Sequence, residues 1–305
     1  MAGPMQRHGM GWLREYPDFR DYTTMREEVA PRLKRLGEIE SVRAMLTKVG
    51  VATPSGLSLP SAVDLRKWCA RIEDQGNLGS CTAQAVVGAV EYFENKAFGK
   101  YIDASRLFLY KVTRTLMHLT GDTGAYLRTT MGGLVLFGVP PEEYWQYEVA
   151  AFDVEPSAFC YAYAQNYQAI SYYRLDAYGT PTDALLLQIK ANLAGKLPAV
   201  FGFTVYNSYH QGDKSGKIPY PAPMDYVVGG HAVVAVGYDD AMKIKNMSPG
   251  GKETKGALLI RNSWGEDWGD QGYGWLPYEY VLKGLAVDWW SLVKSEWIDT
   301  GQFGL

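Results

Sequence analysis

The chain has 305 residues, a formal net charge of −3, and 47% hydrophobic, 13% aromatic and 21% charged residues. This composition is ordinary for a folded protein and excludes a disordered chain. The small negative charge offers no basic field for nucleic acid or anionic lipid, so neither partner is expected. No run of roughly eighteen apolar residues occurs, and we therefore expect no membrane span.

The three cysteines, Cys69, Cys81 and Cys160, cannot form a disulfide framework, because at most one pair can form. None of them lies within metal-ligand spacing of another, and the four histidines are scattered, so we expect no metal site and no cofactor. The first twelve residues lack the apolar region of a secretory signal peptide, and none is expected there. Export by another route stays open, as does the compartment.

The first 58 residues differ in character from the rest. Residues 12–19 hold three aromatic side chains and a proline, which predicts an extended path. Apolar residues then recur every three to four positions from Leu33 to Leu46, which predicts an amphipathic helix, although Gly37 weakens it. A linker rich in Gly, Pro and Ser follows over residues 50–60. We predict an N-terminal segment over 1–58 and a globular domain over 59–305.

The globular part begins with helical patterns and ends with strands. A buried helix is predicted over residues 80–94, starting near Cys81, and interrupted helical periodicity continues over 101–173. Short apolar strands are predicted over 199–206, 232–237 and 257–261, and the polar stretch 239–256 is expected to be a solvated hairpin loop. This order favours an α+β fold with a mainly helical lobe over about 59–170 and a mainly β lobe over about 171–305.

Cys81 is the first candidate for chemistry. It stands at the start of the predicted buried helix, where the helix dipole and unpaired N–H groups favour a thiolate. The glycines at 76 and 79 allow another backbone to approach closely. Alone, the signal is weak, because a buried cysteine is usually a small inert apolar residue.

His231 opens an apolar strand behind Gly229 and Gly230, which leave room beside the ring. An imidazole at this position can take the thiol proton and return it to a leaving amine. A lone histidine at a strand end would more often be structural. The other histidines, His8, His118 and His210, lack such a setting and are interpreted as surface or structural residues.

Asn262 follows a predicted strand and is itself followed by Ser263 and Trp264. Its side-chain oxygen could accept from the imidazole and hold the ring in one orientation without adding charge. Trp264 could cover that hydrogen bond and keep water away. Taken singly, Asn262 could equally be a turn residue among glycine-rich loops.

Together, Cys81, His231 and Asn262 occur in the order that this chemistry requires, and the sequence here resembles the papain-like cysteine peptidases. The resemblance covers almost all of residues 59–280, including Leu59-Pro60-Ser61-Ala62-Val63-Asp64, which is similar to the start of the family's mature chain. It implies a two-lobed fold with a helical left lobe, a β-barrel-like right lobe and a cleft between them. It also implies that Gln75 contributes to an oxyanion hole, and that Gly124 and Gly230 lie where substrate binds.

Two departures, together with the opening Asp18-Phe19-Arg20-Asp21-Tyr22, favour similarity to prokaryotic members over lysosomal ones. The position three residues before Cys81, where the family often has a disulfide cysteine, is Leu78. The residue after Cys81 is Thr82 in place of the usual Trp or Tyr. These departures remove disulfide-based stability and leave the triad intact.

The resemblance implies a cysteine endopeptidase that acts on polypeptide substrates. Residues 1–58 are either a flexible tail or docking arm, or a propeptide. Members of this family are typically made with an inhibitory N-terminal segment, so we expect a propeptide that blocks the cleft, with the aromatic stretch around Tyr16 in or near it. Cleavage within residues 50–59 would then activate this zymogen. The alternatives are transferase or deamidase chemistry by the same triad, and a non-catalytic peptide-binding protein, which would be expected to lose Cys81, His231 or Gln75.

Overall fold

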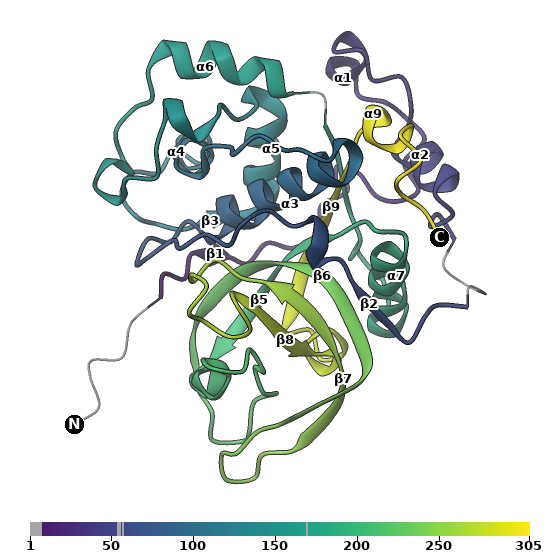
Figure 1. The fold of residues 1–305 in the computed structure, drawn as a ribbon, viewed down its shortest axis with the longest axis vertical. Helices are drawn as coiled ribbons and strands as arrows, with labels where there is room; N and C mark the ends of the chain where they lie inside the picture. The colour runs from purple at the N-terminus through teal and green to yellow at the C-terminus, as the bar shows by residue number, and fades with distance from the viewer. Residues whose placement is uncertain (1–7, 54–55, 57, 169) are drawn as a thin grey trace.

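Two lobes meet along the middle of the molecule, one built from helices and one from a curved sheet (Figure 1). The computed structural model describes residues 8–53, 56, 58–168 and 170–305. The predicted α+β architecture is confirmed: helices dominate the first half of the globular part and strands the second.

The helical lobe is organised around one long buried helix. This helix, α3 (Cys81–Phe98), is buried on nearly all sides and ends at Gly99, whose left-handed backbone (φ 69°) favours glycine. It packs against α4, α5 and the sheet strand β6, so its first residue points to the junction of the lobes. The other helices of this lobe are α4 (Arg106–Leu116), α5 (Leu127–Phe137) and α6 (Ala158–Ala164).

The sheet of the second lobe is antiparallel and open. Its strands lie in the order β4-β9-β5-β6-β7-β8, and β2 pairs with β6 off this path. The sheet curves without closing into a barrel, because β4 and β8 are its edges. The strands are β2 (Ala62–Asp64), β4 (Ser171–Arg174), β5 (Ala199–Tyr206), β6 (Val227–Lys245), β7 (Glu253–Arg261), β8 (Tyr273–Pro277) and β9 (Ala286–Val293).

Strands β6 and β7 extend further than the sequence predicts. The stretch 239–256 was expected to be a loop, but most of it forms the two arms of a hairpin, with Lys243 opposite Lys255 and Lys245 opposite Glu253. The backbone ladder supplies the pairing there, so a strand forms without apolar alternation. Three helices complete this half of the chain: α7 (Thr182–Ala194), α8 (Tyr278–Leu282) and α9 (Ser295–Ile298).

The described part of the N-terminal segment begins at residue 8 and has two parts. Its first part runs between the lobes as β1 (Trp12–Leu13), which pairs in parallel with β3 (Ala125–Tyr126). Its second part forms α1 (Pro31–Arg35) and α2 (Val42–Lys48) beside α9. One continuous helix over Leu33–Leu46 is therefore wrong: Gly37, with φ 93°, ends the first helix and redirects the chain.

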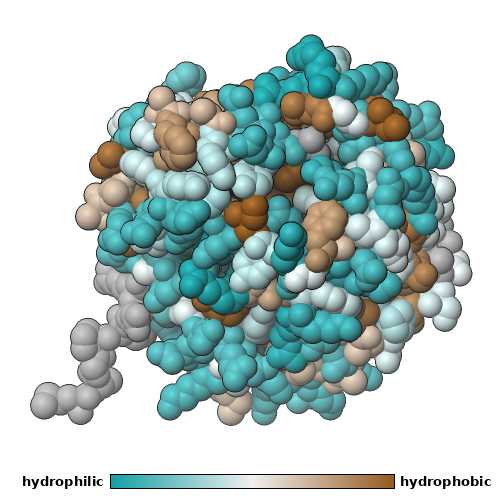
Figure 2. Space-filling model, turned by 45° about the horizontal axis from the view of Figure 1, so that its top comes forward, coloured by the Kyte–Doolittle hydropathy of each residue, from teal (hydrophilic) through white to brown (hydrophobic). Residues whose placement is uncertain are grey.

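The visible surface in Figure 2 is mostly hydrophilic, with hydrophobic residues in separate spots. Among the residues that the structure describes, no helix is long and apolar enough to cross a membrane.

Candidate active site

Cys81 is the first residue of α3 and is completely buried. Its Sγ accepts two backbone hydrogen bonds, each of 3.4 Å: one from Ala232 N–H and one from Gly11 N–H. Ala232 directly follows His231 on β6, so the helix start and the strand that carries the imidazole meet at the sulfur. The predicted meeting of Cys81 with the His231 strand is present in the fold.

His231 is held by Asn262. The imidazole Nε2 donates to Asn262 Oδ1 at 2.7 Å, and the same oxygen accepts from Ser263 N–H at 2.8 Å. Because this oxygen is an acceptor, Nε2 carries the proton and Nδ1 of the neutral ring is left as an acceptor. Nδ1 is buried and has no hydrogen-bond partner among the described residues. It is thus available to take a proton.

The strand pairing explains why Asn262 reaches His231. Val234 lies opposite Arg261 in the β6–β7 register, and Asn262 is the next residue beyond the end of β7. Trp264 is buried and stacks on the His231 ring, with centroids 4.4 Å apart.

Gln75 lies beside this pair, on the loop that precedes α3. Its backbone N–H donates to Ser263 C=O at 2.9 Å, and its side-chain Oε1 accepts from Ser263 Oγ at 2.5 Å. Its side-chain Nε2 donates to Leu78 C=O at 2.8 Å and to Gly9 C=O at 3.1 Å. The side chain is therefore fixed by Ser263 and aims an N–H at a carbonyl oxygen next to the cysteine.

The N-terminal segment occupies the site through its backbone. Gly9 C=O takes the hydrogen bond of Gln75, and Gly11 N–H points at the sulfur of Cys81. A Cβ on Gly11 would stand 1.8 Å from Gly79 O, so only glycine permits this approach. His8 stacks on Trp264 with centroids 4.6 Å apart. Residues 8–11 therefore engage both the Cys81 sulfur and the Gln75 side-chain amide.

Trp12 fills the space next to these contacts. Its indole lies against Gly202 and Gly230, and its Nε1 donates to Asp288 Oδ2 at 3.1 Å. Gly124 packs against the backbone of Gly11, and Ala125 N–H donates to Gly11 C=O at 2.8 Å. Gly124 and Gly230, which the sequence suggests for substrate binding, therefore both contact the N-terminal segment.

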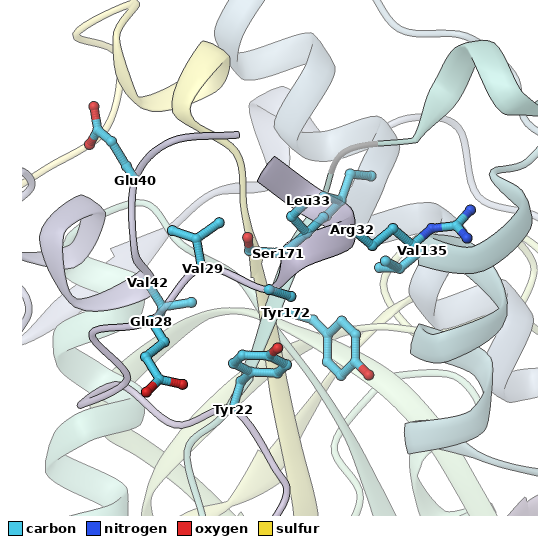
Figure 3. Close-up of a pocket in the computed structure, with 12 residues that line it drawn as sticks. Tyr22, Glu28, Val29, Arg32, Leu33, Glu40, Val42, Val135, Ser171 and Tyr172 are labelled. Atoms are coloured by element: carbon cyan, nitrogen blue, oxygen red, sulfur yellow. The ribbon is translucent and has the colours of Figure 1, made fainter. Parts of the chain in front are cut away.

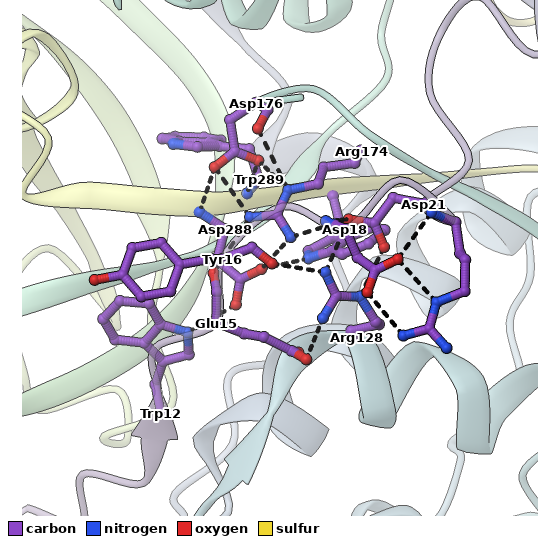
Figure 4. A network of polar contacts seen from close by, with 12 residues as sticks. Trp12, Glu15, Tyr16, Asp18, Asp21, Arg128, Arg174, Asp176, Asp288 and Trp289 are labelled. Carbon is purple, nitrogen blue, oxygen red and sulfur yellow. Dashed lines mark hydrogen bonds and ion pairs between the residues drawn. The ribbon is translucent and has the colours of Figure 1, made fainter. Parts of the chain in front are cut away.

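Two arginines, the buried Arg174 and the partly buried Arg128, fasten the next residues of the segment (Figure 4). Arg128 binds Asp21 with Nε–Oδ1 at 2.7 Å and also pairs with Glu15. Arg174 binds Asp176 at 2.9 Å and Asp288 at 3.2 Å on the body of the protein, and reaches Asp21 at 3.5 Å. Between Glu15 and Asp21 two side chains turn outward: Tyr16 is 73% exposed and Phe19 is 94% exposed. The expectation that the stretch around Tyr16 lies in the cleft is corrected to residues 8–12.

Burial keeps Cys81 and His231 neutral in this covered arrangement. Burial raises the pKa of Cys81 to about 11, and the hydrogen bonds from Ala232 and Gly11 oppose this rise only in part. Burial likewise lowers the pKa of His231 to about 4, against the hydrogen bond to Asn262. The thiolate expected from the helix start is thus not favoured here, because desolvation outweighs the N–H donors.

Sequence reasoning missed four contributors: His8, Trp12, Ser263 and Asp288. The alternation of glycine in His8-Gly9-Met10-Gly11-Trp12 was a usable signal, since it marks backbone that must approach closely. Ser263 lies within the frame already singled out for Asn262. Nothing local to Asp288 indicates its role, because β9 brings it to Trp12 across 276 residues.

The other two questions are whether Cys69 and Cys160 pair and whether the chain holds a metal site. All three cysteines are free thiols, so Cys69 and Cys160 do not pair. No cluster of three or more His, Cys, Asp or Glu side chains suited to a metal ion occurs within the described ranges.

Comparison with known proteins places this site in a family. The family model described as papain family cysteine protease matches residues 59–282. An uncharacterized peptidase C1-like protein of Acanthamoeba polyphaga mimivirus is 35% identical over 225 residues, which span 72% of this chain and 68% of that protein. The pro-cathepsin H of Medicago truncatula is 28% identical over 84% of this chain and 67% of its own length.

A solved structure agrees over nearly the whole length. The crystal structure of xylellain, a cysteine protease from Xylella fastidiosa, matches with a TM-score of 0.70 and 31% identity, over 96% of this chain and 99% of that chain. The predicted papain-like fold is thereby confirmed, and the chain belongs to the papain family of cysteine proteases.

Proposed function

We propose that the chain is an endopeptidase that hydrolyses peptide bonds through Cys81, His231 and Asn262, and that the full-length chain is its latent form. One observation carries the catalytic part of the proposal. The 2.7 Å hydrogen bond from His231 Nε2 to Asn262 leaves Nδ1 as a buried acceptor, one residue away from the N–H that contacts Cys81 Sγ.

The proposed reaction is acyl transfer through a thioester. Cys81 Sγ bonds to the scissile carbonyl carbon while its proton passes to His231 Nδ1. Gln75 Nε2 donates to the carbonyl oxygen as negative charge develops there, in the position where it now meets Gly9 C=O. The C–N bond breaks as His231 returns the proton to the amine, and water then hydrolyses the thioester with His231 as the base.

Latency is supported by occupancy and by electrostatics. A substrate carbonyl would need the Gln75 N–H that Gly9 now holds, and a substrate backbone would need the space of Gly11. The covered site also excludes the water that would stabilise a thiolate–imidazolium pair, which is why the pKa of Cys81 is raised and that of His231 is lowered. Displacing the segment removes both obstacles at once.

The test is turnover of a fluorogenic peptide amide by the full chain and by a variant whose segment is loosened, Trp12→Ala, with Cys81→Ala in each background as the control. We expect turnover that needs Cys81 and that rises when the segment is loosened. The proposal would be wrong if the chain released ammonia from glutamine side chains, or transferred an acyl group to an added amine, without hydrolysing the peptide. The chain would then be a deamidase or a transferase.

A further inference from the structure

The N-terminal segment consists of two parts that are attached to the protein in different ways. We call residues 8–22 the plug, because they contain the contacts to the active site, and residues 31–52 the clamp. The plug is held by a two-residue strand pairing, by Trp12 and by the Arg128 and Arg174 ion pairs.

The clamp is part of the hydrophobic core. Five of its buried apolar side chains belong to the same contiguous cluster as those of the helical lobe and the sheet: Val42, Met45, Leu46, Val49 and Val51. Met45 and Leu46 have no exposed surface at all. A Cβ on Gly195 would stand 2.5 Å from Val51, so a larger residue at position 195 would clash with the clamp. Removing the clamp would open the core to water.

The clamp is also joined to the C-terminal end of the chain. The Glu38 carboxylate is buried and accepts from Ser295 N–H at 2.9 Å, at the start of α9. Val49 C=O accepts from Leu305 N–H at 3.1 Å, and Lys48 pairs with Asp299 at 3.0 Å. These contacts join two ends of the sequence into one structural unit (Figure 1).

Between plug and clamp lies a connector, residues 23–30, with the opposite properties. Apart from a single bridge at Thr23, it has no helix or strand, and Met25, Glu27 and Glu28 are exposed, Met25 by 54%. Beneath its end is a cavity of about 130 Å³ bounded by Tyr22, Val29, Leu33, Val135 and Tyr172, among others (Figure 3). Thr24 is buried, and Arg26 C=O accepts from Arg43 N–H at 3.2 Å. The other connector residues are partly or largely exposed and incompletely packed beneath, as is typical of segments that open locally and are cut by proteases.

We propose that residues 25–30 of the connector are the maturation site, and that residues 31–52 remain in the mature enzyme as part of its core. This rests on the proposed function of the chain as a latent peptidase. A peptidase, either another copy of this chain or a separate one, hydrolyses one peptide bond there: water adds its OH to the acyl carbon and its proton to the amine nitrogen.

The consequence of a cut depends on where it falls. A cut in the connector leaves the plug without its tether and so without the millimolar effective concentration that a short tether supplies. A cut within residues 50–59, the linker suggested by the sequence, would leave the plug covalently joined to a clamp that stays buried. Residues 54, 55 and 57 of that linker lie outside the described residues.

The experiment compares two full-length chains, each carrying the same recognition sequence for an orthogonal site-specific peptidase. The recognition sequence replaces residues 25–28 in the first chain and residues 53–56 in the second. Both are prepared folded and uncut, with Cys81 and with Cys81→Ala, and then cut. Size-exclusion chromatography with intact-mass analysis follows the fragments of the Cys81→Ala forms, and fluorogenic turnover follows the active forms at decreasing protein concentration.

We expect the connector cut to release the plug fragment at nanomolar concentration and to raise turnover at least tenfold, while the linker cut leaves both fragments together and turnover unchanged. Release of residues 1–52 after the linker cut, or retention of the plug after the connector cut at all dilutions, would overturn the inference. If fragments separate as expected but no form turns over substrate, the inference stands and the proposed peptidase function fails.

Discussion

Replacing Trp12 with alanine is the most direct test of how the plug is held. Trp12 is 6% exposed, its indole fills the space that Gly202 and Gly230 leave, and it donates to Asp288. It is the largest buried side chain of the plug, and it contributes to the covered state alone. Its loss should therefore shift the equilibrium between covered and open cleft while leaving the two lobes folded.

The magnitude follows from burial. A tryptophan buries roughly 150–250 Å², and truncation of a buried Trp to Ala costs about 3–5 kcal/mol. We take about 3 kcal/mol, because Asp288 keeps its partners Trp290 and Arg174 and because water can enter the vacated space. Since each 1.4 kcal/mol is a factor of ten, the ratio of open to covered chains should rise about a hundredfold.

The assay is turnover of a fluorogenic peptide amide by uncut full-length Trp12→Ala, with intact mass measured before and after. We expect background activity to rise about a hundredfold, or to the level of the fully open enzyme if that is reached first. Phe19→Ala is the matched control, because this aromatic residue of the same plug is 94% exposed and should change activity by no more than about twofold. Equal activities of wild type and Trp12→Ala, with unchanged melting temperature, would refute the argument that this indole holds the plug.

The remaining predictions concern the triad, the thiol and the clamp. Cys81→Ala and His231→Ala should each abolish turnover in the opened chain, and the double variant should be no worse than either, because the two groups act as a unit; more than a few per cent residual activity would contradict this. At pH 8 on the order of one thousandth of the Cys81 thiol is ionised in the covered chain, since its pKa is raised to about 11. At pH 8, iodoacetamide should therefore label Cys81 slowly in the wild type and at least tenfold faster in Trp12→Ala, as followed by mass spectrometry. Labelling of the half-buried Cys69 should be the same in both proteins. Equal rates of Cys81 labelling would argue that the plug does not cover Cys81. Leu46→Ala in the Cys81→Ala background should lower the free energy of unfolding by at least about 2 kcal/mol and the melting temperature by about 4 °C or more. The control is Leu36→Ala, which should have little effect because Leu36 is 40% exposed. Similar melting temperatures for the two variants would show that the clamp is not part of the core.

The local elements that carry the site could be predicted from the sequence. The buried helix beginning at Cys81 is visible in its apolar faces, and the strands that precede Asn262 and contain His231 are visible in their short apolar runs. The order Cys, His, Asn within recognisable motifs then indicates the chemistry. Hydrophobic periodicity and local motifs suffice here, because each of these elements buries its own apolar residues and its functional residue stands at or near its end.

The tertiary structure alone decided how residues 8–52 are used. Amphipathic spacing predicts that Leu33 to Leu46 are buried, but it does not say against what, and only the fold brings this stretch to α9 and the last residues of the chain. Likewise, the aromatic residues 12, 16 and 19 are equivalent in sequence, yet Trp12 is buried and Phe19 is exposed. The difference depends on Gly202 and Asp288, which are distant in sequence and create space and a hydrogen-bond acceptor for one indole. Such contacts depend on three-dimensional complementarity between distant segments, and this leaves no periodic signal in the sequence.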